Sequence, residues 1–397
     1  MRVLQINATY GGSTGKIMCE LAEVLNQNGH QCFFATPFST NKYDVSSTYT
    51  IGGAFDHRLH AFLSRAMGKQ GYFSKRATKG LLNWIDKISP DVIITHNLHS
   101  NYININLLFD YIAKKRIKTL AVMHDCWLFT GKCFHFLYSG CEKWRNGCGG
   151  CPQLKLEQPS LFFDKTARVL ADKQEYIGNN DNVQIIAVSE WLADLSRQSI
   201  LKDRPTSVIR NGIDLDTFKY YSSAREELGI DSDRFVILGM GNKWLAPYNR
   251  ELLTKVISTL KDDEQLIIVG CSNEKICESN DKVKYVGKLN HSELVKYYSA
   301  ADVFVNATKA DSLPTVNMES VACGTPVVTY ASGGSPELVS EGKTGYIVKF
   351  GDVDGIIEAI GAVKRDTRTF YHDSCVEYAK EEFDKKNNFL KYLSQLG

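Results

Sequence analysis

Two carboxylates placed eight positions apart, Asp311 and Glu319, are the residues of this sequence best suited to bind a ligand. Asp311 stands just before Pro314, and proline is tolerated at the first helical position because its missing N–H would be unpaired there. With about 3.6 residues per helical turn, eight positions bring both acids to roughly the same face. Two acids beside a helix N-terminus suit a ligand whose hydroxyls lie next to an anion, such as a nucleotide diphosphate sugar.

The elements around these acids form two strand–turn–helix units in succession. An apolar strand is predicted over 302–306, followed by a helix over 314–323 that ends at Gly324. A second strand, 326–330, leads to the glycine turn 333–334. Both turns therefore lie at the carboxyl ends of strands, which is where open α/β sheets bind ligands.

The run from Asn306 to Glu337 resembles the signature of the retaining, GT-B-type glycosyltransferases of family 4. The shared features are two acids separated by seven residues, the run ACGTPVV, and the turn GG-x-P-E, although Asp311 stands where the family usually has Glu. The resemblance implies an α/β fold of the GT-B type, with two Rossmann-like domains facing each other across a cleft.

The same resemblance implies transfer of a sugar, with retention, from a nucleotide diphosphate sugar to a hydroxyl of a lipid-linked oligosaccharide. The expected setting is bacterial polysaccharide synthesis, and no cofactor is required for catalysis. Two alternatives stay open: a GT-B nucleotide-sugar epimerase, and a non-catalytic subunit that binds a nucleotide sugar through a degraded phosphate site.

The resemblance also assigns roles to residues. Glu319 is expected at the donor ribose, Asp311 at the donor sugar hydroxyls and His124, within MHDCWLFTG, at the donor sugar. The residues expected to face the donor phosphates are Gly11, Gly12, Leu313, Pro314, Thr315, and Lys243 or Arg250. Lys243 and Arg250 are substitutes, because the family's Arg-Lys-Gly pattern is replaced here by the run Pro247-Tyr248-Asn249.

The first half of the chain has its own polar strand ends. Strands are predicted over 3–6, 31–36, 91–95 and 119–123, the first followed by a glycine loop and a helix. The strand over 91–95 ends in His96, Asn97 and His99, which are candidates for the acceptor side of the site. A lone histidine at such a position is also compatible with a purely structural role.

Four cysteines crowd into the segment 133–151: Cys133, Cys141, Cys148 and Cys151. Four thiolates around a single C-x-x-C pair could bind a structural zinc, while packed free thiols and a redox pair are the alternatives. No other metal is expected.

Residues 56–88 place basic side chains among Leu, Phe, Met and Trp, namely His57, Arg58, Arg65, Lys69, Lys75, Arg76 and Lys79. Such a region either forms the charged outer face of core helices or rests on anionic lipid at the inner face of the cytoplasmic membrane.

Composition sets the remaining limits. The 397 residues are 43% apolar and 23% charged, as in ordinary soluble proteins, and a formal charge of +2 argues against a nucleic-acid binder. The start MRVLQINATYGG enters a strand directly, so we expect a cytoplasmic protein without a signal peptide or transmembrane helix. The predicted domains are 1–212 and 213–370, with a linker near 215–233 and a tail over about 371–397 that packs back on the first domain.

Overall fold

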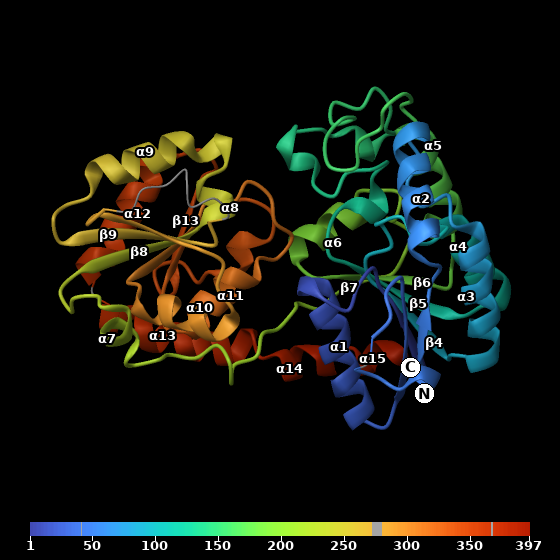
Figure 1. Ribbon diagram of the computed structural model, residues 1–397, viewed down its shortest axis with the longest axis horizontal. Coiled ribbons are helices and arrows are strands. Elements are labelled where there is room, and N and C mark those ends of the chain that lie inside the picture. Colours follow the sequence, from blue (N-terminus) through green and yellow to red (C-terminus); the bar gives the residue numbers. More distant parts are fainter. Residues whose placement is uncertain (41, 272–279, 367) are drawn as a thin grey trace. The chain divides into compact units, whose positions relative to one another are not determined.

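The computed structural model describes residues 1–40, 42–271, 280–366 and 368–397. Two compact units divide the chain: one comprises Met1–Arg210 with Phe389–Gly397, and the other comprises Asn211–Asn388. Each unit is built on its own parallel sheet covered by helices (Figure 1), which is the Rossmann-like α/β architecture. No helix among the described residues is both long and apolar enough to cross a membrane.

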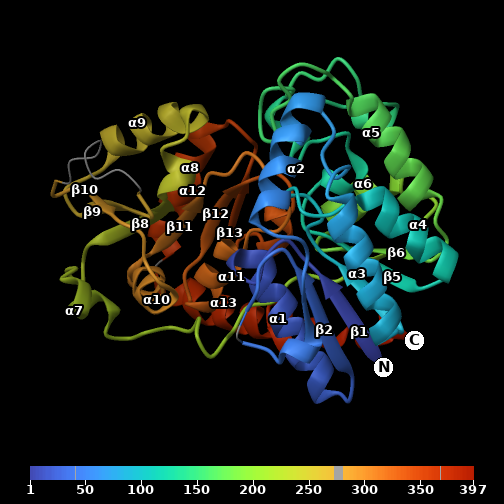
Figure 2. The same ribbon diagram turned by 45° about the vertical axis from the view of Figure 1, so that its right-hand side comes forward.

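The first unit holds a seven-stranded sheet with the order β3-β2-β1-β4-β5-β6-β7. Its strands are β1 Arg2–Ile6, β2 Gln31–Thr36, β3 Thr48–Thr50, β4 Val92–Thr95, β5 Lys118–Met123, β6 Val183–Ala187 and β7 Thr206–Val208. Its helices are α1 Gly12–Gln27, α2 Ala54–Met67, α3 Lys75–Ile88, α4 Ile105–Lys115, α5 Thr166–Lys173, α6 Glu190–Arg197 and α15 Leu393–Leu396, and α14 Lys385–Leu390 spans the boundary between the units. Both views show α3 and α4 lying side by side along this unit (Figures 1 and 2).

The second unit holds a six-stranded sheet with the order β10-β9-β8-β11-β12-β13. Its strands are β8 Phe235–Met240, β9 Glu264–Val269, β10 Val283–Val286, β11 Val303–Asn306, β12 Val327–Tyr330 and β13 Gly345–Val348. Its helices are α7 Ala224–Leu228, α8 Gly241–Trp244, α9 Arg250–Thr259, α10 His291–Ala300, α11 Thr315–Ala322, α12 Val353–Asp366 and α13 Arg368–Glu382.

Both sheets have buried, nearly uniform apolar strands because helices cover parallel sheets on both faces. The strands β4 and β11, for example, are buried along their whole length. The strands predicted from the sequence are present, with ends that differ by two residues or fewer. The short edge strand β3 was not predicted, because three residues carry too little periodicity to be recognised.

The predicted linker over 215–233 is not simply a linker, because it contains α7. This helix is fixed by tertiary contacts of Arg225, which donates to Asp302 Oδ2 at 2.6 Å and to the carbonyl oxygen of Ala300 at 3.1 Å. Only Ala224 is buried within the helix, so the sequence lacks the periodic apolar residues from which α7 could have been predicted.

The predicted tail also divides differently from the expectation. Only Phe389–Gly397 group with the first unit, while α13 belongs to the second unit and packs against α11. The buried residues Tyr371, Cys375 and Ala379 recur every four positions along α13 and form the face that holds it there.

Candidate active site

The loop between β11 and α11 is packed tightly against the glycine turn that follows β12. Asp311 is half-buried, and its Oδ1 accepts a hydrogen bond from the backbone N–H of Leu313 at 3.2 Å. The N–H of Gly334 donates to the carbonyl oxygen of Asp311 at 3.0 Å. A Cβ on Gly333 would lie 1.9 Å from that same oxygen, and its φ of +60° is one that side-chain-bearing residues rarely adopt. Glycine is therefore required there for the two loops to meet.

Glu319 lies in the second turn of α11 and is only 8% exposed. Its Oε2 accepts a hydrogen bond from the hydroxyl of Tyr298, on α10, at 3.1 Å. Burial, together with the nearby Glu319 carboxylate, holds the pKa of Tyr298 well above its ordinary value, so the tyrosine is a neutral donor. The structure thus fixes one carboxylate oxygen of Glu319 within the second unit.

The start of α11 leaves backbone donors without a side-chain cap. Pro314 occupies the N-cap position and is buried, as is Leu313, whereas Thr315 is half-buried. The first N–H groups of a helix lack intrahelical partners and carry a partial positive charge. This end of α11 therefore has the donors and the field that a phosphate group requires.

The segment that departs from the Arg-Lys-Gly pattern forms a short 3-10 turn, Pro247–Asn249. The side chain of Asn249 is buried and donates to the carbonyl oxygens of Ala307, at 2.6 Å, and Lys243, at 3.0 Å. The turn is consequently tied to the loop that leads to Asp311. Arg250 begins α9 and is exposed.

Lys309 is a cation at this site that the sequence did not single out. Its backbone N–H donates to the hydroxyl of Tyr248, a residue of the departing segment, and its Nζ lies 5.7 Å from the ring centroid of Phe350. The only signal in the sequence was a single basic residue in the loop Asn306–Pro314, whose proximity to Tyr248 depends on the fold.

In the first unit, polar residues follow the carboxyl ends of β1, β4 and β5. His96 is 5% exposed; its Nδ1 lies 3.0 Å from Nε2 of His124, and its Nε2 lies 3.0 Å from Oε1 of Gln5. His124 itself is half-buried. Burial lowers the pKa of His96 well below its ordinary value and that of His124 to about 4, so both rings are neutral near pH 7.

His96, an acceptor-side candidate from the sequence, has both ring nitrogens in hydrogen-bond contact within the first unit. Both ring nitrogens are engaged by Gln5 and His124, and the ring is buried behind the partly exposed His124. Gln5 was missed by the sequence reasoning, although a polar residue inside the apolar strand Val3–Ile6 was a usable signal.

Asn97 and His99 are half-buried and lie at the same sheet edge. The amide of Asn97 donates to Oγ1 of Thr14, at the start of α1, at 3.5 Å. His99 Nε2 lies 3.0 Å from Oδ2 of Asp125. Burial raises the pKa of Asp125, but His99 and the N–H of Trp127 lower it by a larger amount. The net pKa of Asp125 therefore lies below its ordinary value, and the group is a carboxylate.

The glycine loop opens α1 with exposed backbone. Gly11 is the N-cap and Gly12 the first residue of the helix, and no side chain caps its N–H groups. Gly12 has a φ of +69°. Gly15 must be glycine because a Cβ there would lie 2.4 Å from the backbone carbon of Tyr10.

Family models match both halves of the chain. The family model described as Glycosyltransferase Family 4 matches residues 14–217, just over half of the 397-residue chain. The model described as Glycosyl transferases group 1 matches residues 222–382. This chain belongs to glycosyltransferase family 4.

Three curated relatives of this family 4 chain illustrate the range. A putative colanic acid biosynthesis glycosyl transferase of Escherichia coli K12 is 24% identical over 64% of each chain. A D-inositol 3-phosphate glycosyltransferase of Mycobacterium sp. strain JLS is 30% identical over 43% of this chain and 42% of its own. An uncharacterized glycosyltransferase of Methanocaldococcus jannaschii is 26% identical over 92% of this chain and 88% of its own. The chain thus spans less than two thirds of the first two relatives.

Solved structures show the fold of the family 4 chain. The sucrose-phosphate synthase of Thermosynechococcus elongatus has a TM-score of 0.69 at 18% identity, covering 100% of this chain and 98% of its own. HepE of Anabaena, in complex with UDP, has a TM-score of 0.67 at 15% identity, covering 100% of this chain and 99% of its own. These similarities confirm the predicted GT-B fold with two Rossmann-like units.

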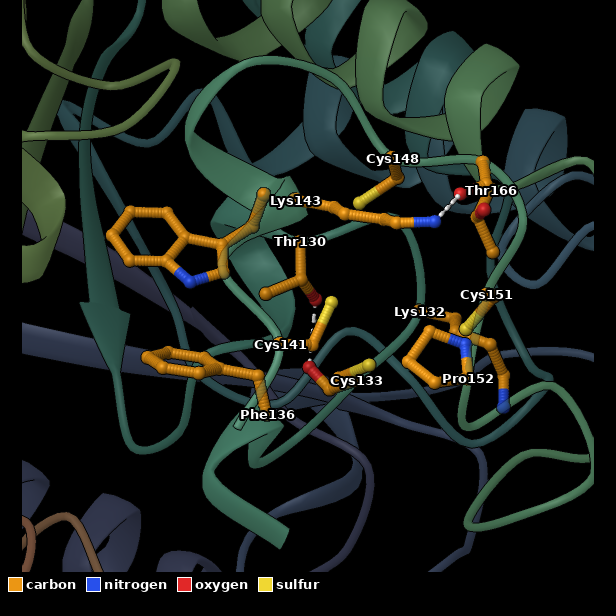
Figure 3. A pocket seen from close by; sticks show the side chains of 12 residues that line it. Thr130, Lys132, Cys133, Phe136, Cys141, Lys143, Cys148, Cys151, Pro152 and Thr166 are labelled. Atoms are coloured by element: carbon orange, nitrogen blue, oxygen red, sulfur yellow. Dashed lines mark hydrogen bonds between the residues drawn. The ribbon is translucent and has the colours of Figure 1, made fainter. Parts of the chain in front are cut away.

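The cysteine-rich segment of this family 4 chain does not fit a zinc ion. Cys133, Cys141, Cys148 and Cys151 line one pocket (Figure 3). Nevertheless, no group of three or more His, Cys, Asp or Glu side chains in the described parts of the chain is arranged to hold a metal. Cys133 instead hydrogen-bonds Cys151, which raises the pKa of Cys133 and lowers that of Cys151 to about 6. The structure favours free thiols packed in a loop.

Proposed function

We propose that this protein is a retaining glycosyltransferase that moves a hexose from a nucleotide diphosphate sugar to a hydroxyl of a lipid-linked oligosaccharide in bacterial polysaccharide synthesis. The observation that carries the proposal is the packing of the Asp311 loop against the glycine turn Gly333–Gly334, at the start of α11. That packing holds an acid and uncapped helix donors together. The relative named for colanic acid biosynthesis and the neighbour solved with UDP support the substrate classes.

In the second unit we assign the donor nucleotide to the loops around α11. Glu319 binds the ribose diol, and Asp311 binds hydroxyls of the donor sugar. The N–H groups that follow Leu313 face the diphosphate, where a helix N-terminus stabilises negative charge. Lys243 and Arg250 are further candidates for phosphate contacts.

The same groups would supply the rate enhancement. As the bond between the anomeric carbon and the diphosphate breaks, negative charge grows on the leaving diphosphate, and preoriented donors stabilise that charge in the transition state. The acceptor hydroxyl attacks from the face that the diphosphate leaves and passes its proton to an oxygen of the leaving diphosphate, so the anomeric configuration is retained. In the first unit we assign His124 to the donor sugar, Gly11 and Gly12 to the diphosphate, and Asn97 and His99 to the acceptor.

A surface of the first unit suits contact with an anionic membrane. Along α2 the apolar side chains Phe55, Leu59 and Phe62 recur at helical spacing and face outward; Phe55 is 77% exposed and Phe62 is 65% exposed. Arg58 and Arg65 are exposed on the same helix. Aromatic side chains flanked by arginine bind the interface of anionic lipid bilayers.

The neighbouring loop extends this surface. Leu161 donates its backbone N–H to the carbonyl oxygen of Arg65 at 2.8 Å, which places the exposed residues Leu161, Phe162 and Phe163 at the end of α2. Lys165 adds an exposed positive charge beside them. We propose that this face, α2 with residues 161–165, rests on the inner face of the cytoplasmic membrane, where a lipid-linked acceptor would be found.

Calorimetry with UDP-, GDP-, ADP- and dTDP-sugars tests the donor site. Glu319→Gln keeps the shape of the side chain but removes its charge, and we expect donor affinity to fall roughly 10- to 100-fold, the effect of a hydrogen bond to a charged group. Glu358→Gln makes the same change on the exposed face of α12 and is the matched control. Absence of binding by the wild type at millimolar concentration would overturn the donor assignment.

Product analysis distinguishes the transferase from its alternatives. With a lipid-linked oligosaccharide present, a transferase releases nucleoside diphosphate and extends the acceptor by one sugar. An epimerase changes the donor without an acceptor, and a non-catalytic subunit binds the donor but changes nothing. Either of the last two results would refute the proposal.

Vesicle flotation tests the membrane face. The double variant Phe55→Ser/Phe62→Ser should lose binding to vesicles that contain phosphatidylglycerol, and high salt should weaken wild-type binding because the arginines contribute. Phe370→Ser removes a similarly exposed phenylalanine (55% exposed) from the second unit and serves as control. Equal loss by the control, or no wild-type binding, would refute the assignment.

A further inference from the structure

A chain of three hydrogen-bonded side chains runs from the interior of the first unit to His124. Gln5 Nε2 donates to the carbonyl oxygen of Met18 at 3.1 Å, Gln5 Oε1 lies 3.0 Å from His96 Nε2, and His96 Nδ1 lies 3.0 Å from His124 Nε2. Gln5 and His96 are buried, whereas His124 is half-buried. The chain therefore links a fixed backbone group to a partly exposed ring.

The carbonyl oxygen of Met18 sets the direction of every hydrogen bond in this chain. The carbonyl oxygen of Met18 can only accept, so the amide nitrogen of Gln5 must face it and the amide oxygen must face His96. That oxygen can also only accept, so His96 carries its proton on Nε2. Because burial keeps His96 neutral, its Nδ1 is a lone pair and must accept a hydrogen bond from His124.

The ring geometry agrees with a direct N–H···N hydrogen bond. The centroids of His96 and His124 are 5.3 Å apart and the ring planes differ by 18°. The centroid separation exceeds the 3.0 Å nitrogen–nitrogen distance by about the two centroid-to-nitrogen lengths, so the rings lie edge to edge in nearly one plane. An in-plane arrangement is the one that a ring N–H donor and a ring lone pair require.

We propose that Gln5 and His96 are positioning residues that lock His124 in its Nε2–H tautomer and leave its Nδ1 as a hydrogen-bond acceptor. Within the described chain, His96 is the hydrogen-bond partner found for the His124 ring. The neighbouring carboxylate of Asp125 is occupied, because Oδ1 accepts from the N–H of Trp127 at 2.8 Å and Oδ2 faces His99. Asp125 therefore does not compete with His96 for the ring of His124.

The consequence concerns what His124 can recognise. A neutral imidazole that offers only a lone pair binds a hydroxyl donor and repels a phosphate or carboxylate oxygen. This recognition role rests on the proposed function: His124 would select the part of the ligand that presents a sugar hydroxyl. The tautomer itself does not depend on that function.

Long-range ¹H–¹⁵N spectra of the protein labelled at its histidines test the tautomer directly. In the wild type we expect a protonated-type ¹⁵N shift for His124 Nε2 and an unprotonated-type shift for Nδ1, with His96 also protonated at Nε2. The variants His124→Asn and His96→Asn assign the signals. A protonated Nδ1 on His124 in the wild type would overturn the proposal, whether or not the protein transfers sugar.

Two variants of Gln5 test the source of the lock. Gln5→Met keeps the length of the side chain but removes the acceptor, so His96 can reverse and the ¹⁵N signals of His124 should move toward a mixture of tautomers, a change of about fivefold in their ratio for one net hydrogen bond. Gln5→Glu restores an acceptor and should restore the wild-type tautomer. Unchanged His124 shifts in folded Gln5→Met would refute the role of Gln5.

Kinetic measurements distinguish the tautomer of His124 from its proposed role in recognising a sugar hydroxyl. If the protein transfers sugar, Gln5→Met should lower kcat more than it raises KM, and Gln5→Glu should recover part of the loss. If no transfer occurs in any variant but the tautomer is as stated, the proposed function fails and the positioning role stands. If transfer occurs but Gln5→Met is kinetically silent, the recognition role of His124 Nδ1 fails.

Discussion

Replacing Gly333 with alanine should damage the donor site through a single added methyl group. The new Cβ would lie 1.9 Å from the carbonyl oxygen of Asp311, and the residue would have to keep a φ of +60°. We expect about 1–2 kcal/mol from the left-handed backbone and about 1–3 kcal/mol from overpacking, hence a loss of roughly 2–5 kcal/mol in the stability of the second unit. The Asp311 loop must also shift, so donor affinity should fall by at least about tenfold.

Gly342 provides a matched control for the backbone cost. Its φ is +72°, but a Cβ there would meet no atom of the described chain within 4 Å. Gly342→Ala should therefore cost only about 1–2 kcal/mol and leave donor affinity unchanged. Urea titration followed by hydrogen exchange on peptides of the second unit gives its stability separately from that of the first unit. Equal destabilisation by the two variants, with equal donor affinity, would refute the reasoning about close packing.

Three further predictions follow from single contacts. Tyr298→Phe removes the hydroxyl that donates to Glu319 and should destabilise the second unit by about 1.5–3 kcal/mol in urea unfolding; a change below about 0.5 kcal/mol would contradict that hydrogen bond. Lys309→Met should weaken binding of UDP more than binding of uridine in calorimetry, if the ammonium group of Lys309, whose backbone contacts Tyr248, serves the phosphates; equal effects would exclude that role. Burial lowers the pKa of His60 to about 4 in the folded protein. As the pH falls below about 6.5, His60 therefore becomes protonated in the unfolded state but not in the folded state, and the protein loses stability between about pH 6.5 and pH 4. The stability difference between wild type and His60→Asn should therefore shrink by about 2 kcal/mol from pH 7 to pH 5, and a constant difference would show that His60 is not held neutral.

The sequence was sufficient for most of the fold because its signals are local. The apolar strands and the glycine turns after them are legible from composition and spacing, as are the helix starts at Gly12 and near Pro314. The errors fall where order comes from distant contacts. The helix α7 depends on Arg225 reaching Asp302, and the position of α13 depends on a buried face that matches α11.

The candidate site divides in the same way. Asp311 and Glu319 were candidates because their residue types and spacing form a motif within a short stretch of chain, and His124 was a candidate because its run MHDCWLFTG resembles the family. Their surroundings were not: the Tyr298 hydroxyl on Glu319 and the meeting of Tyr248 with Lys309 join segments far apart in sequence. For the four cysteines the sequence suggested more than the fold provides, because their spacing permitted a zinc site that the folded loop does not form.

The sequence by itself therefore determined the α/β class and the family signature, and it supplied the candidate residues Asp311, Glu319 and His124, since each depends on periodicity or on neighbours along the chain. Only the tertiary structure decided that His96 is buried behind His124 and that Gln5 faces it. The physical reason is that the direction of a hydrogen bond depends on the donors and acceptors that the fold brings within about 3 Å, and spacing along the chain does not contain that information.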